Sequence, residues 1–431
     1  MMIPSPGLSS ISPRGSVAGR GSGPDGASPF SLGLVVPSKA MLFGEYGVLY
    51  GGPALVATLP HPRMVFEAEI LSCARLSSLG AAGVPMGQES LRFWSPMVAA
   101  PISFGPDGEA LDGARRSQGP VRFIAACLGA LAGKLHTLAA ARVVLSVRVT
   151  EEIAPELGLG SSSALLVGLA ALVNRAVALV AGEDNRGCGV TEVLAQESWH
   201  QLLGCLRAAQ GRGSGYDLAA QSVAAHWMDP VSVVQTATSP GDAMLEGDAE
   251  VMQGRLWTFV PAAAQLQGGG VPQLFEWVEH PFWNQSGWLL PSGIAAATGA
   301  VLGAAGRREE EFAERHSALA NEALKRLGDR ALWSSTAPVA PFAELCDAAL
   351  ALAREQGIAD HARAGASLDL LRAELAYKTM GAGCGDCLWI VPRRQGPEGH
   401  QEHCTGVRRE LPKGAFKLGC TTQRTEQLHR I

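Results

Sequence analysis

The sequence predicts an α+β fold of two domains, and three features of the chain support this prediction. With 431 residues, the chain is long enough for two domains of ordinary size. Apolar and polar residues alternate through residues 141–150, as in a half-buried strand, and an apolar segment without proline follows at residues 164–181, as in a core helix. Glycine- and proline-rich segments separate these patterns from further helical and strand-like stretches.

Composition along the chain divides it into a tail and two domains. Residues 1–30 are rich in glycine, serine and proline and carry little apolar material, so we expect a disordered tail. The first domain is expected at residues 31–260. A patch rich in glycine, glutamine and proline predicts a boundary near residues 260–285, with the second domain at residues 285–431.

Local patterns predict the elements of each domain. An apolar run followed by glycines at residues 31–53 predicts a β-hairpin of short strands, and residues 192–203 have a helical pattern. In the second domain, a glycine loop at residues 378–387 leads into a short apolar strand. Helical patterns precede that loop at residues 302–327, 340–355 and 367–377.

Overall charge and hydrophobicity favour a protein that acts on a small molecule. The net charge of −5 provides no general attraction to nucleic acid or to an anionic membrane, so any phosphate must be bound by local groups. The apolar segment 164–181 is long enough to span a membrane, but Asn174 and Arg175 interrupt it and no aromatic belt flanks it, which favours a buried helix. We therefore expect neither a nucleic-acid partner nor a membrane partner.

Cysteine usage indicates a reducing compartment. The nine cysteines are an odd number without regular spacing, and the first 30 residues lack the apolar core of a secretory signal. These features predict reduced thiols and a cytoplasmic location. The sequence does not determine the oligomeric state, and a homodimer is compatible with it.

Residues 155–164 form a glycine turn between the predicted strand and the predicted core helix. The first amides of a helix and its partial positive charge together bind anions, and serine hydroxyls can donate to phosphate or bind Mg²⁺. In the alternative interpretation, Ser162 only caps the helix, as serine often does. The pattern is neither of two common phosphate loops, because the one Gly-Lys pair is followed by Leu135 and because Ser163 stands where a dinucleotide loop needs its third glycine.

Three glycine loops, at residues 37–53, 155–164 and 378–387, resemble the three motifs of the GHMP kinase superfamily in order and spacing. Within that superfamily, Gly44-Glu45-Tyr46, residues 210–220 and residues 381–387 look most like phosphomevalonate kinases. Mevalonate kinases and galactokinases usually carry Glu-His where Glu45 and Tyr46 stand. The resemblance covers nearly the whole chain outside the tail.

This resemblance implies a fold and an activity. It implies an N-terminal ribosomal-protein-like domain and a C-terminal ferredoxin-like domain, with ATP, Mg²⁺ and a small-molecule acceptor bound between them. The implied reaction is phosphorylation of 5-phosphomevalonate to 5-diphosphomevalonate in the mevalonate isoprenoid pathway. Mevalonate kinase, another GHMP small-molecule kinase and a catalytically silent metabolite-binding relative are the alternatives.

The resemblance also implies roles for individual residues. Asp217 matches the catalytic base and Lys39 matches the first-motif lysine, which would lower the pKa of the acceptor hydroxyl and offset phosphate charge. Ser162 and Glu197 match the ligands of Mg²⁺. The nucleotide would contact Pro155, Gly158, Leu159, Gly160, Ser161, Ser162 and Ser163. The acceptor would contact Glu45, Tyr46, Arg212, Ser214, Gly381, Ala382 and Gly383.

Each of these residue types also has an ordinary structural role. Asp217 could occupy a tight turn, Lys39 could face solvent and Glu197 could lie on a helix surface. Arg148 and Lys378 are weaker candidates for binding an anionic acceptor. Cys384 and Cys387 have the spacing of a redox or zinc motif, but no second pair stands at a matching interval.

One segment departs from the phosphomevalonate kinase pattern. Residues 290–299 stand where those kinases have a stretch richer in hydroxyls and lysine, whereas Ile294 and Ala297 offer no polar groups. Either the contacts to the acceptor are rearranged or the acceptor differs. Cys384 also stands where family members commonly have glycine.

Overall fold

The computed structural model describes most of the two predicted domains. The described residues are 30–73, 88–116, 118–183, 190, 196–210, 213–228, 254–261, 272–278, 280, 287–291, 309–333, 341–355, 374–380, 387–393 and 416–417. Residues 1–29 of the predicted tail and the segment 292–299 lie outside them, while Phe30, placed in the tail by the prediction, begins the first strand.

A long β-hairpin forms the centre of the large sheet. Strand β1 (Phe30–Phe43) pairs antiparallel with β2 (Ala54–Ser72), and the short helix η1 (Gly47–Tyr50) lies between them. A hairpin is therefore confirmed, but its second strand begins at Ala54, after the predicted range 31–53, and the prediction of short strands was wrong. Shifts in register, one of them between Pro37 and Ser38, let these long strands continue through irregular positions.

Eight described strands make up this sheet. Its main path runs β4-β3-β5-β2-β1-β6, and β7 and β8 extend it from β2. The other strands are β3 (Leu91–Trp94), β4 (Ile102–Phe104), β5 (Val143–Glu151), β6 (His226–Trp227), β7 (Arg255–Val260) and β8 (Gln273–Glu276). Strand β5 confirms the strand predicted at residues 141–150. Strand β8 falls within the predicted boundary region and pairs with β7, while the domain limits themselves remain a prediction.

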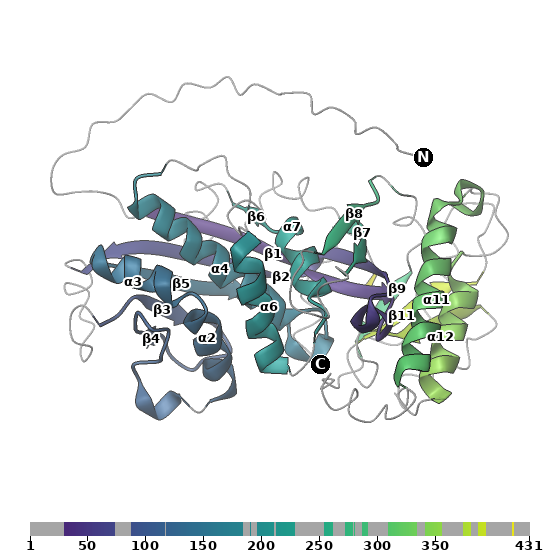
Figure 1. The fold of residues 1–431 in the computed structure, drawn as a ribbon, viewed down its shortest axis with the longest axis horizontal. Helices are drawn as coiled ribbons and strands as arrows, with labels where there is room; N and C mark the ends of the chain where they lie inside the picture. The colour runs from purple at the N-terminus through teal and green to yellow at the C-terminus, as the bar shows by residue number, and fades with distance from the viewer. Residues whose placement is uncertain are drawn as a thin grey trace, which may run out of the picture.

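Helices cover one face of this sheet. They are α2 (Gly119–Gly129), α3 (Ala132–Ala140), α4 (Ser161–Val180), α6 (Gln196–Gln210) and α7 (Tyr216–Ala224). Figure 1 shows α4 lying along the sheet, where it packs against β1 and β2. Helix α4 is long and apolar enough to cross a membrane, but 72% of its most apolar window is buried inside the protein, as predicted for a core helix.

A smaller sheet and two long helices form the other end of the molecule. The sheet has the order β10-β11-β9-β12, with its strand pairs antiparallel. Its strands are β9 (Trp288–Pro291), β10 (Leu375–Thr379), β11 (Cys387–Pro392) and β12 (Phe416–Lys417). Helices α11 (Glu309–Gly328) and α12 (Ala343–Glu355) pack side by side, as Figure 1 shows.

These elements confirm two of the three helical predictions for this region, within the described residues. Helices α11 and α12 fall inside or next to the predicted ranges 302–327 and 340–355. The third prediction was wrong at its end, because Leu375–Tyr377 belong to β10 and pair with β11. A short apolar run is compatible with either a helix or a strand, and here pairing with β11 makes residues 375–377 part of a strand.

An aromatic cluster joins the two sheets. Phe43 at the end of β1 lies 5.5 Å from Phe342 and 5.6 Å from Trp389 on β11, measured between ring centroids in edge-to-face geometry. All three side chains are buried in one hydrophobic core that extends through both sheets. The segments on either side of this cluster are therefore held in fixed relation.

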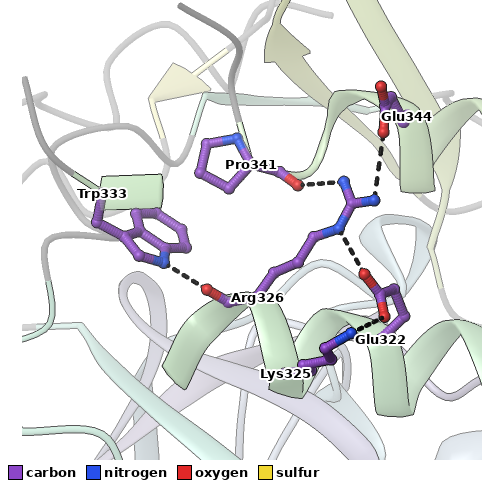
Figure 2. Close-up of polar contacts among 6 residues, drawn as sticks. All are labelled: Glu322, Lys325, Arg326, Trp333, Pro341 and Glu344. Carbon is purple, nitrogen blue, oxygen red and sulfur yellow. Dashed lines mark hydrogen bonds and ion pairs between the residues drawn. The ribbon is translucent and has the colours of Figure 1, made fainter. Parts of the chain in front are cut away.

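Arg326 connects α11 to the segments that follow it (Figure 2). Its guanidinium donates to Glu322 in its own helix, to the Pro341 carbonyl at 2.9 Å and to Glu344 in α12 at 3.2 Å. Its own carbonyl accepts from the Trp333 indole at 2.8 Å, in the short helix η6 (Arg330–Trp333). The Arg326 side chain thus links α11 to α12 and to Pro341 just before it.

Candidate active site

The glycine turn ends at the N-terminus of α4. Strand β5 ends at Glu151, the short helix η3 (Pro155–Leu157) follows, and both Gly158 and Gly160 have left-handed backbones, with φ of 63° and 86°. Gly160 is the N-cap residue of α4, and no side chain caps the helix. The alternative in which Ser162 acts only as the cap is therefore wrong.

The first amides of α4 are available to bind an anion. Ala164 is the first residue to donate back to Gly160, so the amides of Ser161, Ser162 and Ser163 have no acceptor within the helix. Ser161 and Ser162 are half-buried, and within the described part of the chain the Ser162 hydroxyl has no hydrogen-bond partner. Such a set of donors at the positive end of a helix suits a phosphate group.

Ser163 differs from its two neighbours. Its side chain is fully buried, and its hydroxyl lies 2.5 Å from Gln221 Oε1 and 3.0 Å from the Gly160 carbonyl. The hydroxyl is therefore used inside the protein. Ser163 can contribute its backbone amide to an anion, as predicted for the nucleotide loop.

Lys39 reaches this loop from β1. Its ammonium donates to the Gly158 carbonyl at 3.2 Å and to the Tyr216 hydroxyl at 2.7 Å, and its backbone amide donates to the Leu159 carbonyl at 3.0 Å. Only 5% of the residue is exposed, so the alternative of a solvent-facing lysine is wrong. A positive charge thus lies beside the glycine turn and next to the residue that precedes Asp217.

Asp217 lies in the first turn of α7. This helix also begins after a left-handed glycine, Gly215, with φ of 77°. The Asp217 carboxylate accepts the Leu218 amide at 2.9 Å and is half-buried, while buried Ser214 places its hydroxyl oxygen 3.5 Å from the Tyr216 amide. The carboxylate therefore stands at a helix N-terminus, on the residue after Tyr216, whose hydroxyl the Lys39 ammonium contacts.

Tyr216 remains protonated in this environment. Burial raises the pKa of the Tyr216 hydroxyl, the negative charges of Asp217 and Glu45 add to this effect, and the Lys39 ammonium opposes it. A neutral hydroxyl can accept from the Lys39 ammonium and keep its own proton. Tyr216 is thus a fixed neutral partner for a buried cation.

Glu45 belongs to a buried ionic cluster. It forms an ion pair with Lys378 of β10, and His316 Nδ1 of α11 lies 3.7 Å from its other oxygen. Burial alone would raise the pKa of Glu45, but Lys378 and His316 outweigh burial and lower it. Lys378, considered above as a possible acceptor ligand, is 2% exposed and also donates to the Thr379 carbonyl at 2.7 Å.

Tyr46, the neighbour of Glu45, is also buried. Its ring lies 4.8 Å from that of Phe312 and 5.3 Å from that of His316, both on α11. Its backbone has a positive φ of 48°, which is uncommon outside glycine. The first motif is therefore packed against the second half of the molecule, and the acceptor contacts predicted for Glu45 and Tyr46 remain predictions.

The third glycine loop can be placed by its two ends. Gly381, Ala382 and Gly383 lie outside the described residues, as does Arg212. The amide of Met380 donates to the Cys387 carbonyl at 3.0 Å, and the Cys387 thiol donates to the Leu157 carbonyl at 3.2 Å. Cys387, the residue that follows this loop in the sequence, therefore lies beside the glycine turn before α4.

Cys387 is buried, and its partner in the Cys-x-x-Cys spacing, Cys384, lies outside the described residues. Among the residues that the structure describes, no three His, Cys, Asp or Glu side chains come together as a metal group. The hydrogen bond to Leu157 gives Cys387 a structural role.

A magnesium site can be tested against the residues only in part. The Ser162 hydroxyl at the start of α4 is a suitable oxygen ligand. Glu197 lies on α6, which packs against α4, although its side chain is outside the description. The other predicted cation, Arg148, is exposed and lies 5.0 Å from the centre of the Trp94 ring.

Sequence reasoning missed three residues of the site. Gln221 is fully buried and bonds to Pro37, Gly160 and Ser163, and its position four residues after Asp217 on one helix was a usable signal. Tyr216, adjacent to Asp217, offered a similar signal. Nothing in the sequence around His316 indicates its contact with the first motif.

Comparisons with known proteins support the fold. No protein-family model matches the sequence, and no curated protein matches it. Among solved structures, Methanococcus jannaschii mevalonate kinase has a TM-score of 0.53 and 14% identity, over 91% of this chain and 98% of that chain. Lactococcus lactis galactokinase, complexed with galactose, has a TM-score of 0.53 and 12% identity, over 90% and 94%.

A third structure contains ligands. Streptococcus pneumoniae phosphomevalonate kinase, in complex with phosphomevalonate and AMPPNP, has a TM-score of 0.51 and 16% identity, over 90% of this chain and 98% of that chain. At such identities the likeness establishes the fold alone. It confirms the predicted two-domain α+β class.

Proposed function

We propose that this chain is a small-molecule kinase of the GHMP superfamily, which transfers the γ-phosphoryl group of ATP to an acceptor hydroxyl. One observation carries the proposal: segments far apart in the sequence converge on the N-terminus of α4. Lys39 joins β1 to the glycine turn and to α7, while Cys387 joins the end of the third loop to Leu157. A simple metabolite-binding relative would not need the cation, the carboxylate and the free helix amides together.

The chemistry follows from what each group can do. The amides of residues 161–163 would hold phosphate oxygens, and the Lys39 ammonium would offset negative charge on the transferred group. Asp217, at a helix N-terminus, would accept the proton of the acceptor hydroxyl. Mg²⁺ held by Ser162 and Glu197 would neutralise phosphate charge.

For the acceptor we propose 5-phosphomevalonate. The Tyr that follows Glu45 and the Gly-Asp-Cys end of the third loop support this choice, as does the fold shared with a kinase that was solved with phosphomevalonate and AMPPNP. Mevalonate is the second candidate, because a mevalonate kinase shares the fold to the same degree. A cytoplasmic location and a homodimer remain predictions.

Coupled ADP release with Mg-ATP tests the proposal, with mevalonate, 5-phosphomevalonate and galactose compared side by side. We expect turnover with 5-phosphomevalonate. Turnover with mevalonate alone would move the assignment to that acceptor, and the absence of turnover with all three and of ATP binding would refute the kinase assignment.

Asp217→Asn tests the role of the carboxylate within that assay. The amide keeps the shape and can still accept the Leu218 amide, but it cannot take up a proton. We expect turnover to fall by about two to four orders of magnitude, the usual contribution of a general base, while ATP binding persists. Near-normal turnover would remove Asp217 from this role.

A further inference from the structure

Gln221 is the point at which three parts of the site meet. Its side-chain nitrogen donates to the Pro37 carbonyl at 2.9 Å and to the Gly160 carbonyl at 3.1 Å, and its oxygen accepts from Ser163 at 2.5 Å. These partners belong to β1, to the glycine turn and to α4, while Gln221 itself belongs to α7.

The orientation of this amide is determined by its partners. Two carbonyl oxygens face the nitrogen, which has two hydrogens to donate, and a hydroxyl faces the oxygen. The reverse orientation would place the oxygen against both carbonyls. Because Gln221 is fully buried, water cannot replace any lost contact, and every bond made by this side chain acts on the geometry of the site.

The three bonded segments carry the groups assigned above to phosphoryl transfer. Pro37 stands two residues before Lys39 on β1, and Gln221 lies one helical turn after Asp217. Gly160 directly precedes the free amides of α4, and Ser163 carries the last of them. Space around the turn is also tight, since a Cβ added to Gly160 would meet Lys39 Cε at 2.9 Å and Gln221 Nε2 at 3.1 Å. A shift of any one segment would move the others.

We propose that Gln221 is a positioning residue, which sets the glycine turn, the lysine strand and the aspartate helix in the relative geometry needed for phosphoryl transfer. It touches none of the reacting atoms and acts through Ser163, Gly160 and Pro37. This inference rests on the proposed function. Interactions of this kind affect activity strongly, since an error of about 1 Å in a reacting group lowers a rate by about a hundredfold.

Gln221→Met is the first test, because methionine has a similar length and volume without the amide. We expect it to weaken binding of a fluorescent ATP analogue by about tenfold, through misplaced amide donors, and to lower turnover further. The matched control is Ser222→Ala, at the next position of α7, where the hydroxyl donates to the Leu218 carbonyl of its own helix. That variant should bind and turn over like wild type.

A double-mutant cycle separates positioning from simple loss of stability. Ser163→Ala removes the hydroxyl that bonds Gln221, so its effect on analogue affinity should be non-additive with Gln221→Met and additive with Ser222→Ala. Additive effects of Ser163→Ala and Gln221→Met would overturn the proposal. A cooperatively folded Gln221→Met protein with wild-type affinity and turnover would overturn it as well.

Two further outcomes are also decisive. If Gln221→Met does not fold, Ser163→Ala is tested alone. Faster amide hydrogen exchange at residues 158–164 together with weaker binding of the ATP analogue would support the proposal. Unchanged exchange and unchanged binding would overturn it. If wild-type protein binds no ATP analogue, the kinase assignment fails and this inference fails with it. Wild-type binding with unaffected variants refutes the positioning role alone.

Discussion

Lys39 illustrates how a single residue connects the chemistry to the fold. Its stem is buried in the large sheet, and its ammonium has two located acceptors, a backbone carbonyl and the Tyr216 hydroxyl. The Tyr216 ring lies 4.9 Å from the ammonium, a distance at which a cation is attracted to an aromatic face. The ammonium is therefore held in place before any phosphate arrives.

Tyr216→Phe should show the value of this arrangement. The variant keeps the ring and removes the hydroxyl, so the Lys39 ammonium loses one acceptor and gains freedom to move. We expect turnover to fall about five- to tenfold, which corresponds to one ordinary hydrogen bond, with protein stability changed little. Steady-state kinetics measure it. Tyr377→Phe, which removes a hydroxyl bonded to Arg354 in the small sheet, is the matched control and should behave like wild type.

The residues that form the site could be predicted to different extents. Lys39, Ser162 and Asp217 stand in glycine-rich motifs, where residue type and spacing together carry the signal. Gln221 stands four residues after Asp217 on one helix, which indicates that the two share a helix face but not which groups the amide contacts. The Glu45–Lys378 pair joins positions 333 residues apart, and no local pattern indicates that contact.

At the scale of elements, the start of α4 depends on a left-handed backbone at Gly160, a conformation that residues with a side chain rarely adopt. Gly160 has a left-handed backbone and lies against Lys39, so two effects oppose a larger residue there. Gly182, after the other end of α4, also has a left-handed backbone, with φ of 78°, but has open space around it. A side chain would therefore cause backbone strain at both glycines, but a steric clash only at Gly160.

Gly160→Ala and Gly182→Ala should therefore differ. Strain of about 1–2 kcal/mol applies at both positions and should appear in chemical denaturation. Only Gly160→Ala pushes on the Lys39 side chain, so it alone should reduce affinity for an ATP analogue, by about tenfold or more. Equal analogue affinity in the two variants would contradict the contact between the turn and Lys39.

Arg326 plays a comparable role for the helices of the second half (Figure 2). Arg326→Ala leaves the Pro341 carbonyl and the Glu344 carboxylate without their partner, so we expect a loss of about 1–3 kcal/mol in the free energy of unfolding. The Trp333 indole keeps its acceptor, because that acceptor is the backbone carbonyl of residue 326. Lys325→Ala, one residue away, removes a side chain that is 81% exposed and should change stability little. Urea titration of both variants makes the comparison.

Elements with a strong local period were predictable, and those defined by pairing were not. The burial of α4 follows from its uninterrupted apolar composition, and β5 follows from alternation. Strand β10 has no alternation of buried and exposed residues, because all five of its residues are buried. Its strand conformation is evident only from its pairing with β11. The addition of β8 to the large sheet is likewise a consequence of pairing with β7.

At the scale of the whole molecule, the two sheets are held together by an aromatic cluster and by one buried ion pair. The pair joins Glu45, just after β1, to Lys378 on β10, and His316 on α11 approaches from a third direction. Because Glu45 and Lys378 come from different halves of the chain, this contact holds the two halves together. It should therefore contribute to stability in a pH-dependent way.

The sign of that dependence follows from the lowered pKa of Glu45. A carboxyl whose pKa is lower in the folded protein stabilises the fold fully above its unfolded pKa, which is about 4.3, and this stabilisation is lost as the pH falls through the folded value. At pH 7, Glu45→Gln should lower the free energy of unfolding by about 3–5 kcal/mol, because the Lys378 charge stays buried without its counter-charge.

The double variant Glu45→Gln/Lys378→Met removes both charges and should recover part of this loss, since an apolar pair avoids the buried charge altogether. Urea unfolding of the wild type, the single variant and the double variant between pH 7 and pH 3 makes the comparison. Wild type should lose stability below about pH 4 more steeply than the double variant. A single variant as stable as wild type at pH 7, or parallel pH profiles for all three proteins, would mean that the aromatic cluster alone holds the two halves together.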